Sequence, residues 1–230
     1  MRVVKKEVLK DRFDRHDLEV ENTHTFVCSG AVVHNCNARY MVQRKPRAWK
    51  RLRWAVRGML RRANPAFEDK DFRLFVSSRG VWRDPAGGSL WARVAREQRL
   101  FDRLKKVPDT VIYGEVIGQA AQGEAFRYGI PADCVEFRMF DFYTPKTLFW
   151  AGWEDVEEMA QKLGLKTPPV VMEGFLRRSD VDGTEDGKSL IDQTTMREGW
   201  VIRTLVSSYT SRGGRAIMKM KSEKFLQAYG

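Results

Sequence analysis

A histidine, an asparagine and a cysteine stand next to one another at residues 34–36. The side-chain amide of Asn35 can attack its own backbone carbonyl, which closes a succinimide ring and cleaves the chain after the asparagine. His34 can assist by proton transfer, because the pKa of an imidazole lies near neutrality. The thiolate of Cys36 can first accept an acyl group as a thioester. These residue types in this order therefore predict acyl transfer coupled to cleavage of the chain.

The residues before Cys36 resemble the C-terminal end of an intein. In HDLEVENTHTFVCSGAVVHN, residues 16–35, an Asp-Leu strand end, a THTF-like segment with His24 and a final His-Asn pair occur in the order of that family. The resemblance implies that Cys36 is the first extein residue and that His24 assists His34 in the cleavage of the chain. The alternative, an ordinary hairpin with an Asn-Cys pair by chance, does not account for the order of these elements.

Only 35 residues precede Cys36, whereas an uninterrupted intein is far longer and begins with its own nucleophile. The segment therefore resembles the short C-terminal half of a naturally split intein, and its N-terminal half is expected on a separate chain. Short strands are expected at 2–9 and 17–22, and a hairpin of the strands 24–30 and 31–35 around a glycine, which would form a small all-β, Hint-type fragment. A fragment of this size is too small to fold stably alone.

Residues 36–230 contain a second set of side chains that could act on a nucleotide. The motifs SSRG, YGEVIG, MFDFY, EGWVIR and MKMK carry, in this order, Arg79, Glu115, Phe140, Glu198, and the pair Lys219 and Lys221. Side chains alternate along a strand, so Lys219 and Lys221 should share one face and could offset the charge of one phosphate. An aromatic ring can stack on a base, and carboxylates suit sugar hydroxyls or Mg²⁺. Each motif alone is a weak signal, because a strand glutamate or a Lys-x-Lys pair is commonly only solvated.

In this order the motifs resemble those of the covalent nucleotidyltransferases, most closely the RNA ligases of the RNA-editing and phage double-strand-repair type. The resemblance covers residues 36–226 and includes QGEAFRYG at 122–129, which is similar to the loop after the third motif of that family. It implies ATP and Mg²⁺ as cofactors. The implied roles are ribose binding by Glu115, adenine stacking by Phe140, ATP contacts by Arg79, Lys219 and Lys221, and metal binding by Glu198.

The first motif of that family, Lys-x-x-Gly, has no counterpart in residues 37–78. Its lysine attacks ATP to form lysyl-AMP, and its glycine is followed by a Thr-Asn pair or a similar pair. Cys36 and Asn37 stand in that place, so the glycine of the motif would directly precede Cys36. The resemblance therefore implies that the nucleophilic lysine lies on the partner chain and that the isolated chain does not adenylate itself.

Residues 44–62, RKPRAWKRLRWAVRGMLRR, contain nine Lys or Arg residues and no acidic residue. Apolar residues recur among them at roughly helical spacing, which predicts a basic amphipathic helix. Its cations, with Arg53, Arg57 and Arg61 as candidates, could contact an RNA backbone, or they could simply be solvated around a packing helix. The net charge of +11 belongs to residues 36–230, because residues 1–35 hold six basic and six acidic residues. A polyanionic partner such as RNA is therefore expected.

The remaining pattern predicts an α+β protein in which residues 36–230 form a mixed antiparallel-sheet nucleotidyltransferase (ATP-grasp-like ligase) domain. Strands are expected at 36–43, 72–78, 110–118, 135–143, 198–206 and 215–221, helices at 89–106 and 152–164, and a polar loop at 177–189. Three cysteines are too few for a disulfide framework or a zinc site. No apolar run reaches the ~18 residues of a membrane span, and a reducing cytoplasm without a membrane partner is expected.

We therefore expect a split-intein fragment at residues 1–35 and an RNA ligase domain, without its first-motif lysine, at residues 36–230. Protein trans-splicing would yield an ATP-dependent RNA ligase that seals a 5′-phosphate to a 3′-hydroxyl through lysyl-AMP. Two alternatives remain. One is a DNA ligase or a capping-type guanylyltransferase, which shares the motif set, and the other is an inactive RNA-binding fragment.

Overall fold

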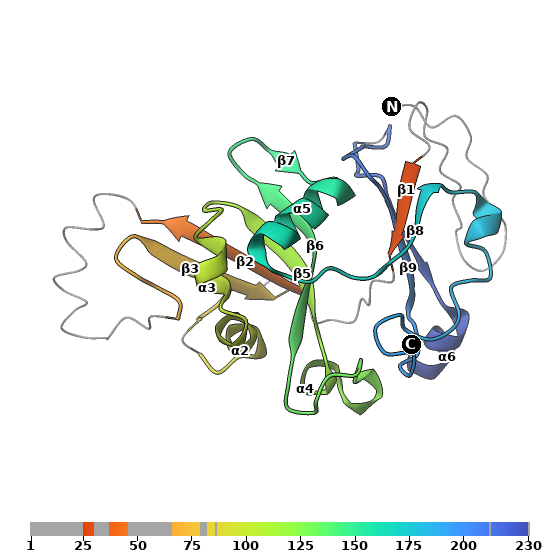
Figure 1. Cartoon of the computed structure of the whole chain (residues 1–230), viewed down its shortest axis with the longest axis horizontal. Helices are drawn as coiled ribbons and strands as arrows, with labels where there is room; N and C mark the ends of the chain where they lie inside the picture. The colour runs from red at the N-terminus through yellow and green to blue at the C-terminus, as the bar shows by residue number, and fades with distance from the viewer. Residues whose placement is uncertain are drawn as a thin grey trace. The chain divides into compact units, whose positions relative to one another are not determined.

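The computed structural model describes residues 25–29, 37–45, 66–78, 82–85, 87–211 and 213–229, which divide between two units (Figure 1). The first unit contains residues 25–29, 151–155 and the described part of 168–229, and the second contains the described part of 37–150 and residues 156–167. Each unit is built on one antiparallel sheet. The expected α+β class is therefore confirmed, while the strands expected at 2–9 and 17–22 lie outside the described residues.

The second unit has a six-stranded sheet with the order β4-β3-β2-β5-β6-β7. Its strands are β2 (Asn37–Arg44), β3 (Phe72–Ser78), β4 (Trp82–Arg83), β5 (Val111–Ile117), β6 (Glu136–Thr144) and β7 (Phe149–Trp150). One face is apolar because alternate residues, such as Tyr40, Val42 and Ile112, are fully buried. The helices α2 (Leu90–Glu97) and α3 (Leu100–Leu104) contact this sheet. The Tyr40 hydroxyl donates to the carbonyl oxygen of Trp91, in α2, at 3.0 Å.

The single helix expected at 89–106 is wrong, because α2 and α3 are separate helices. Arg99, which lies between them, has a φ of 52°, in the left-handed region. In α3, the Arg103 guanidinium donates to the carbonyl oxygens of Gln98 and Leu163, each at 2.8 Å. The break lets α3 turn its apolar side, including Leu104, fully into the core. Packing therefore overrides a continuous helical pattern here.

The basic segment begins as a strand rather than as a helix. Arg44 is the last residue of β2 and pairs with β3. Lys45 follows it and donates from Nζ to Glu68 Oε1 and to the carbonyl oxygen of Asp69, each at 2.6 Å. The helix expected from residue 44 is therefore wrong at its start, because the β2–β3 ladder continues to this point. Residues 46–62 lie outside the described residues.

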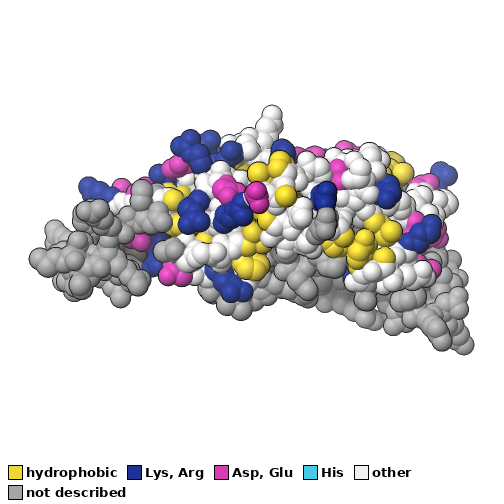
Figure 2. All heavy atoms as spheres, turned by 90° about the horizontal axis from the view of Figure 1, so that it is seen from below, with side chains coloured by type: hydrophobic (Ala, Val, Ile, Leu, Met, Phe, Trp, Pro, Cys, Tyr) yellow, Lys and Arg dark blue, Asp and Glu magenta, His cyan; other side chains and the backbone are white. Residues whose placement is uncertain are grey.

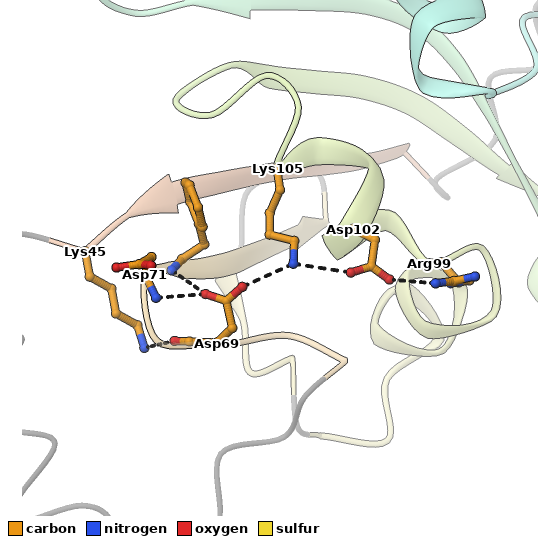
Figure 3. Close-up of polar contacts among 7 residues, drawn as sticks. Lys45, Asp69, Asp71, Arg99, Asp102 and Lys105 are labelled. Atoms are coloured by element: carbon orange, nitrogen blue, oxygen red, sulfur yellow. Dashed lines mark hydrogen bonds and ion pairs between the residues drawn. The ribbon is translucent and has the colours of Figure 1, made fainter.

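A chain of charged groups holds the turn before β3 (Figure 3). The Asp69 carboxylate accepts hydrogen bonds from the backbone N–H groups of Asp71 and Phe72, each at 2.8 Å. The Lys105 ammonium lies 3.1 Å from the Asp69 carboxylate and 3.4 Å from that of Asp102. Burial by itself would raise the pKa of Asp69, but the two N–H groups and Lys105 together lower it. The turn is therefore fixed by hydrogen bonds to a charged acceptor.

The first unit has a four-stranded sheet with the order β10-β9-β1-β8. Its strands are β1 (Thr25–Ser29), β8 (Val170–Phe175), β9 (Gly199–Thr204) and β10 (Ile217–Lys221), and α6 (Glu223–Tyr229) follows β10. Val181, Trp200 and Ile202 form a buried cluster, against which Met218 and Met220 pack. β1 precedes residue 36 in the chain, whereas both of its neighbours in the sheet, β8 and β9, follow that residue. The hairpin expected at 24–35 is therefore wrong for β1, because β8 and β9 occupy both of its edges.

Most expected elements are confirmed with slightly shifted ends. They include the strands expected at 24–30, 36–43, 72–78, 110–118, 135–143, 198–206 and 215–221, and the helix at 152–164, which is α5 (Trp153–Leu163). The polar loop at 177–189 contains the short 3₁₀ turn η2 (Arg178–Asp180) and an isolated bridge between Lys188 and Met196. The sequence does not predict β4, β7, β8, α6, or the short helices α4 (Gln119–Gln122) and η1 (Glu124–Phe126).

Candidate functional site

The first unit holds a buried carboxylate beside two ammonium groups. The Glu198 side chain is 1% exposed and lies immediately before β9. The Lys219 ammonium donates to Glu198 Oε1 at 2.6 Å, and Lys221 Nζ lies 3.7 Å from the same oxygen. The lysine side chains are 26% and 46% exposed, so both can reach a ligand. The predicted common face of Lys219 and Lys221 is confirmed, and their arrangement suits an anion such as a phosphate.

Gly199 brings the start of β9 close to the end of β10. It pairs with Lys221, and a Cβ at this position would lie 1.9 Å from the carbonyl oxygen of Met220. Its φ of 144° also favours glycine. One residue past β10, the Ser222 N–H donates to the carbonyl oxygen of Glu198 at 2.8 Å. This close approach of the two strands positions the Glu198 carboxylate beside both lysines.

Ser222 connects this carboxylate site to the polar loop and to α6. Its buried hydroxyl donates to Asp186 Oδ1 at 2.6 Å and accepts from the Phe225 N–H at 3.0 Å. The second bond caps the first turn of α6. The hydrogen bond from the Ser222 hydroxyl lowers the pKa of Asp186, and the Lys224 ammonium acts in the same direction. Burial acts in the opposite direction but is outweighed. Sequence reasoning misses Asp186, because its bond to Ser222 spans 36 residues.

Arg197, the residue before Glu198, anchors the same polar loop. Its guanidinium carbon lies 3.7 Å from the centre of the Trp200 ring. It also donates to the carbonyl oxygens of Thr184 and Asp186, while Trp200 Nε1 donates to Thr184 Oγ1 at 3.1 Å. The loop is therefore held by Arg197, which precedes Glu198, and by Trp200, which follows it. The motif EGWVIR contains Trp200 but not Arg197.

In the second unit, Glu115 lies near the middle of β5 and is 3% exposed. The register places it opposite Asn37 of β2 and Arg138 of β6. A Cβ on the preceding Gly114 would lie 2.3 Å from the Phe137 ring, which explains the glycine in YGEVIG. Because side chains alternate, Glu115 lies on the sheet face opposite the one that α2 and α3 cover.

Phe140 is the additional residue of a β-bulge in β6. Tyr113 pairs with Asp141 and Gly114 pairs with Met139, so one step along β5 corresponds to two steps along β6. Bulges redirect a side chain and are frequent beside binding sites. Phe140 is half-buried. The bulge is therefore a local reason for a ring to leave the regular alternation of the strand, and stacking of that ring on adenine stays a prediction.

Arg39 and Tyr113 face each other on the same side of this sheet as Glu115. They pair across β2 and β5. The Arg39 guanidinium donates to Ser77 Oγ at 2.9 Å and to the carbonyl oxygen of Ser78 at 3.2 Å. Burial raises the pKa of Tyr113, although Arg39 acts in the opposite direction. The sequence analysis misses Arg39, whose only signal is its position three residues after Cys36.

The structure brings the predicted residues together within each unit. Glu198, Lys219 and Lys221 meet in the first, and Glu115 and Phe140 lie on neighbouring strands of the second. The other predicted residues lie outside the described ranges; they are His24, His34, Asn35, Cys36, Arg53, Arg57, Arg61 and Arg79. Within the described ranges, no group of three or more His, Cys, Asp or Glu residues could hold a metal ion.

The described surface in Figure 2 carries Lys and Arg side chains that are dispersed among acidic and hydrophobic ones. No continuous basic patch covers the described part of this face. Among the helices that the structure describes, none is long and apolar enough to cross a membrane.

Solved structures with a similar fold include several of the RNA ligase of Naegleria gruberi. A lysine-to-alanine variant with ATP and Mn is 16% identical, with a TM-score of 0.63 over 89% of this chain and 52% of that chain. An arginine-to-alanine variant with ATP and Mn is 19% identical, with a TM-score of 0.62 over 89% of this chain and 52% of that one. The chain thus spans about half the length of these ligases.

No match was found among curated protein sequences. The family model described as RNA ligase, however, matches residues 33–221, which include both sheets except β1 and carry the motifs of Glu115, Glu198 and the two lysines. This match covers most of the sequence, and the fold agrees with it. The chain belongs to the RNA ligase family.

Proposed function

We propose that this chain supplies the nucleotide-binding and phosphate-binding residues of an ATP-dependent RNA ligase whose nucleophilic lysine comes from another polypeptide. The observation that carries the proposal is the convergence of Lys219 and Lys221 on the buried Glu198 carboxylate. Two ammonium groups at one position can offset the charge that develops on phosphate oxygens during adenylyl transfer. The ATP and Mn in the similar Naegleria ligase structures support the use of ATP and a divalent metal ion.

The second unit would bind the nucleoside. Glu115 presents a buried carboxylate on the sheet face opposite the one that α2 and α3 cover, where it suits a ribose hydroxyl. Phe140 leaves the regular strand alternation at the bulge, and an aromatic ring that stacks on a base gives affinity without reading base identity. These roles follow the motif order and the placement of the two residues on adjacent strands.

Glu198 is the described residue that best suits Mg²⁺. Magnesium sites commonly combine one or two carboxylates with phosphate oxygens of the substrate and water. The Glu198 carboxylate fits such a set, because it lies beside the two lysines that would bind those phosphates. The metal ion would add positive charge at the phosphate oxygens. Lys219, which donates to Glu198 here, can donate to a phosphate instead.

The upstream part of the enzyme would arrive by protein trans-splicing. The acyl group of the upstream fragment, first carried by the nucleophile of the N-terminal intein half, would move onto the Cys36 thiolate as a thioester and release that nucleophile. Asn35 would then cyclise, with help from His34 and His24, and release residues 1–35. An S-to-N shift would leave a peptide bond at Cys36. The order of the intein-like elements supports this step.

The missing lysine can be tested without the partner chain. The double variant Val32→Lys/Asn35→Gly creates Lys-x-x-Gly directly before Cys36, where the RNA ligase motif would end. The chain should then form acid-labile lysyl-AMP from ATP labelled in its α-phosphate, whereas the wild type should not. The matched control Val33→Lys/Asn35→Gly carries the same charge one residue too late and should stay unlabelled. A folded double variant without label, or label in the wild type, would refute the divided active site.

Splicing is tested separately by mixing the chain with its cognate N-terminal half. Mass spectrometry should detect release of residues 1–35 and a longer ligase. Asn35→Ala should accumulate the branched thioester, because no amide remains to cyclise, and Cys36→Ala should stop the reaction before acyl transfer. Sealing of labelled RNA by the longer product completes the assay. Splicing of Asn35→Ala at the wild-type yield would exclude the intein mechanism.

Residues 46–62 are proposed to bind the RNA backbone. Replacement of Arg53, Arg57 and Arg61 by alanine should weaken binding equally across RNA sequences and flatten the plot of log affinity against log salt by about 0.7 for each lost single-strand contact. Adenylation should be retained. The matched control replaces the exposed lysines 146 and 166, which should leave the slope unchanged. An unchanged slope in the arginine variant would mean that these arginines are only solvated.

A further inference from the structure

β1 joins two parts of the first unit's sheet. On one side it pairs with β8, from Thr25 opposite Phe175 onward. On the other side it pairs with β9, from Phe26 opposite Thr204 to Ser29 opposite Val201. Among the described strands, no other element bridges β8 and the β9–β10 hairpin. Removal of β1 would therefore leave a ladder edge open on each side of the gap.

β8 depends on this central strand. Its only strand neighbour among the described residues is β1. Three of its apolar side chains, Val171, Met172 and Phe175, are 38%, 37% and 73% exposed, so side-chain burial contributes little to its attachment. The β9–β10 pair would keep its buried cluster around Trp200 and Ile202, but the edge of β9 that faces β1 would lose its partner. The sheet thus requires a strand in this position.

Under the proposed function, residues 1–35 leave when the chain is spliced, and β1 leaves with them. We propose that β1 is a placeholder strand, which occupies the slot between β8 and β9 until the last residues of the incoming polypeptide, joined to Cys36, replace it. The occupant is therefore a β-strand of the partner chain. The inference rests on the proposed trans-splicing and adds to it the surface on which the partner strand docks.

The register of β1 against β9 supports this occupant. Ser29, seven residues before Cys36, lies opposite Val201, and each further residue along β1 corresponds to one residue back along β9. An incoming strand in the same register would bring the residue four places before Cys36 to the level of Glu198. The proposed Lys-x-x-Gly motif, which ends directly before Cys36, has its lysine four places before it. The sheet register and the motif spacing therefore both place the proposed lysine at the level of Glu198.

The same register explains why the slot lies next to the carboxylate site. Lys221 pairs with Gly199, the residue after Glu198, on the other side of β9. A strand that fills the slot thus runs toward the end of the sheet where Glu198, Lys219 and Lys221 converge. Splicing would exchange a strand without the nucleophile for one that carries it, while β8 and β9 keep their neighbours.

Hydrogen exchange in the full, unspliced chain tests the placeholder. Val27 lies in the middle of β1, opposite both Glu173 and Arg203. Val27→Pro removes a backbone N–H from a central strand, so amides of β8 and β9 should exchange about tenfold faster or more. Val27→Thr keeps the N–H and should exchange as the wild type does. Amides of β5 and β6, in the second unit, report whether the variant is otherwise folded and should not change.

A synthetic peptide of residues 20–31, added in excess to Val27→Pro, should restore the protection of β8 and β9. After splicing, products from the wild type and from Val27→Pro should show the same protected β8 and β9, because the same incoming strand fills the slot. Unchanged exchange in Val27→Pro, or open β8 and β9 in the spliced product, would overturn the inference while splicing itself could stand. Absence of release of residues 1–35 would instead overturn the splicing and, with it, the exchange of strands.

Discussion

The replacement Lys219→Met removes the ammonium group closest to the buried Glu198 carboxylate. At 2.6 Å and an effective dielectric constant of about 20, the attraction between these charges is about 6 kcal/mol before the cost of desolvation. Much of it is offset, because Glu198 has been taken out of water. Lys221 remains 3.7 Å away and partly compensates the carboxylate. The net loss should therefore approach that of a hydrogen bond to a charged group, about 1.5–3 kcal/mol.

The chain offers its own control in Lys221→Met. Lys221 Nζ is farther from the carboxylate and its side chain is 46% exposed, so its loss should destabilise the unit by less than about 1 kcal/mol. Amide exchange in β9 and β10 measures both variants, and tenfold faster exchange corresponds to about 1.4 kcal/mol. In the Val32→Lys/Asn35→Gly background, both methionine variants should lose adenylation, because both lysines would contact the phosphates. The two methionine variants should therefore differ in stability, whereas both should lose adenylation.

A double-mutant cycle with Glu198→Gln isolates the pair. Lys219→Met and Glu198→Gln should show a coupling free energy of about 1 kcal/mol or more. The stability effects of mutating two contacting charged residues do not add. The corresponding cycle with Lys221→Met should give a smaller value. Equal exchange rates in the two methionine variants, or additive effects of Lys219→Met and Glu198→Gln, would refute the reasoning that Glu198 is held mainly by Lys219.

Three further results are expected. Gly199→Ala should destabilise the first unit by about 2 kcal/mol or more in urea unfolding, because its Cβ would lie 1.9 Å from the Met220 carbonyl oxygen at a φ of 144°; wild-type stability would contradict the close approach of β9 and β10. The pKa of Asp69 is lowered from 3.8, so its charge stabilises the fold above that pH and this contribution is lost as the pH falls through the lower, folded-state pKa. The stability difference between the wild type and Asp69→Asn should therefore shrink below pH 3.8, and a difference that grows would contradict the link to Lys105. Arg197→Lys should speed proteolysis of the loop at 184–188, because a lysine cannot keep both the carbonyl contacts and the ring contact; unchanged proteolysis would contradict that anchoring.

Sequence reasoning predicts those elements whose signal is local. β3 contains an apolar run, Leu74–Val76, and follows the charged residues 68–71, and the strand expected at 72–78 agrees with the structure. Lys219 and Lys221 are two residues apart on a strand, so their common face follows from geometry alone. The glycines of YGEVIG and EGWVIR mark close backbone approaches, which any larger side chain would prevent. For these features the period of the strand and the size of the residue are sufficient.

Other features depend on contacts that are distant in the sequence. The break at Arg99 depends on packing and on Arg103, which reaches Leu163. β8 has few buried side chains, and its pairing comes from β1, more than a hundred residues earlier. The bulge at Phe140 exists only in the pairing with β5. Asp186 belongs to a polar loop that the sequence alone predicts to be solvated, and its hydrogen bond to Ser222 is seen only in the structure. The local periodicity of the sequence does not predict contacts between residues that are distant in the chain.

If the active site is divided at residue 36, as proposed, the charges around Glu198 give a physical reason for the division. Lys219 is hydrogen-bonded to Glu198, and a protonated, ion-paired amine has no lone pair with which to attack ATP. Under the proposed function, this chain would therefore hold phosphates without reacting with them. A lysine that arrives at the level of Glu198 would meet two ammonium groups that already share its carboxylate, and nearby like charges favour the neutral amine. The proposed strand exchange would thus bring the nucleophile next to these two ammonium groups.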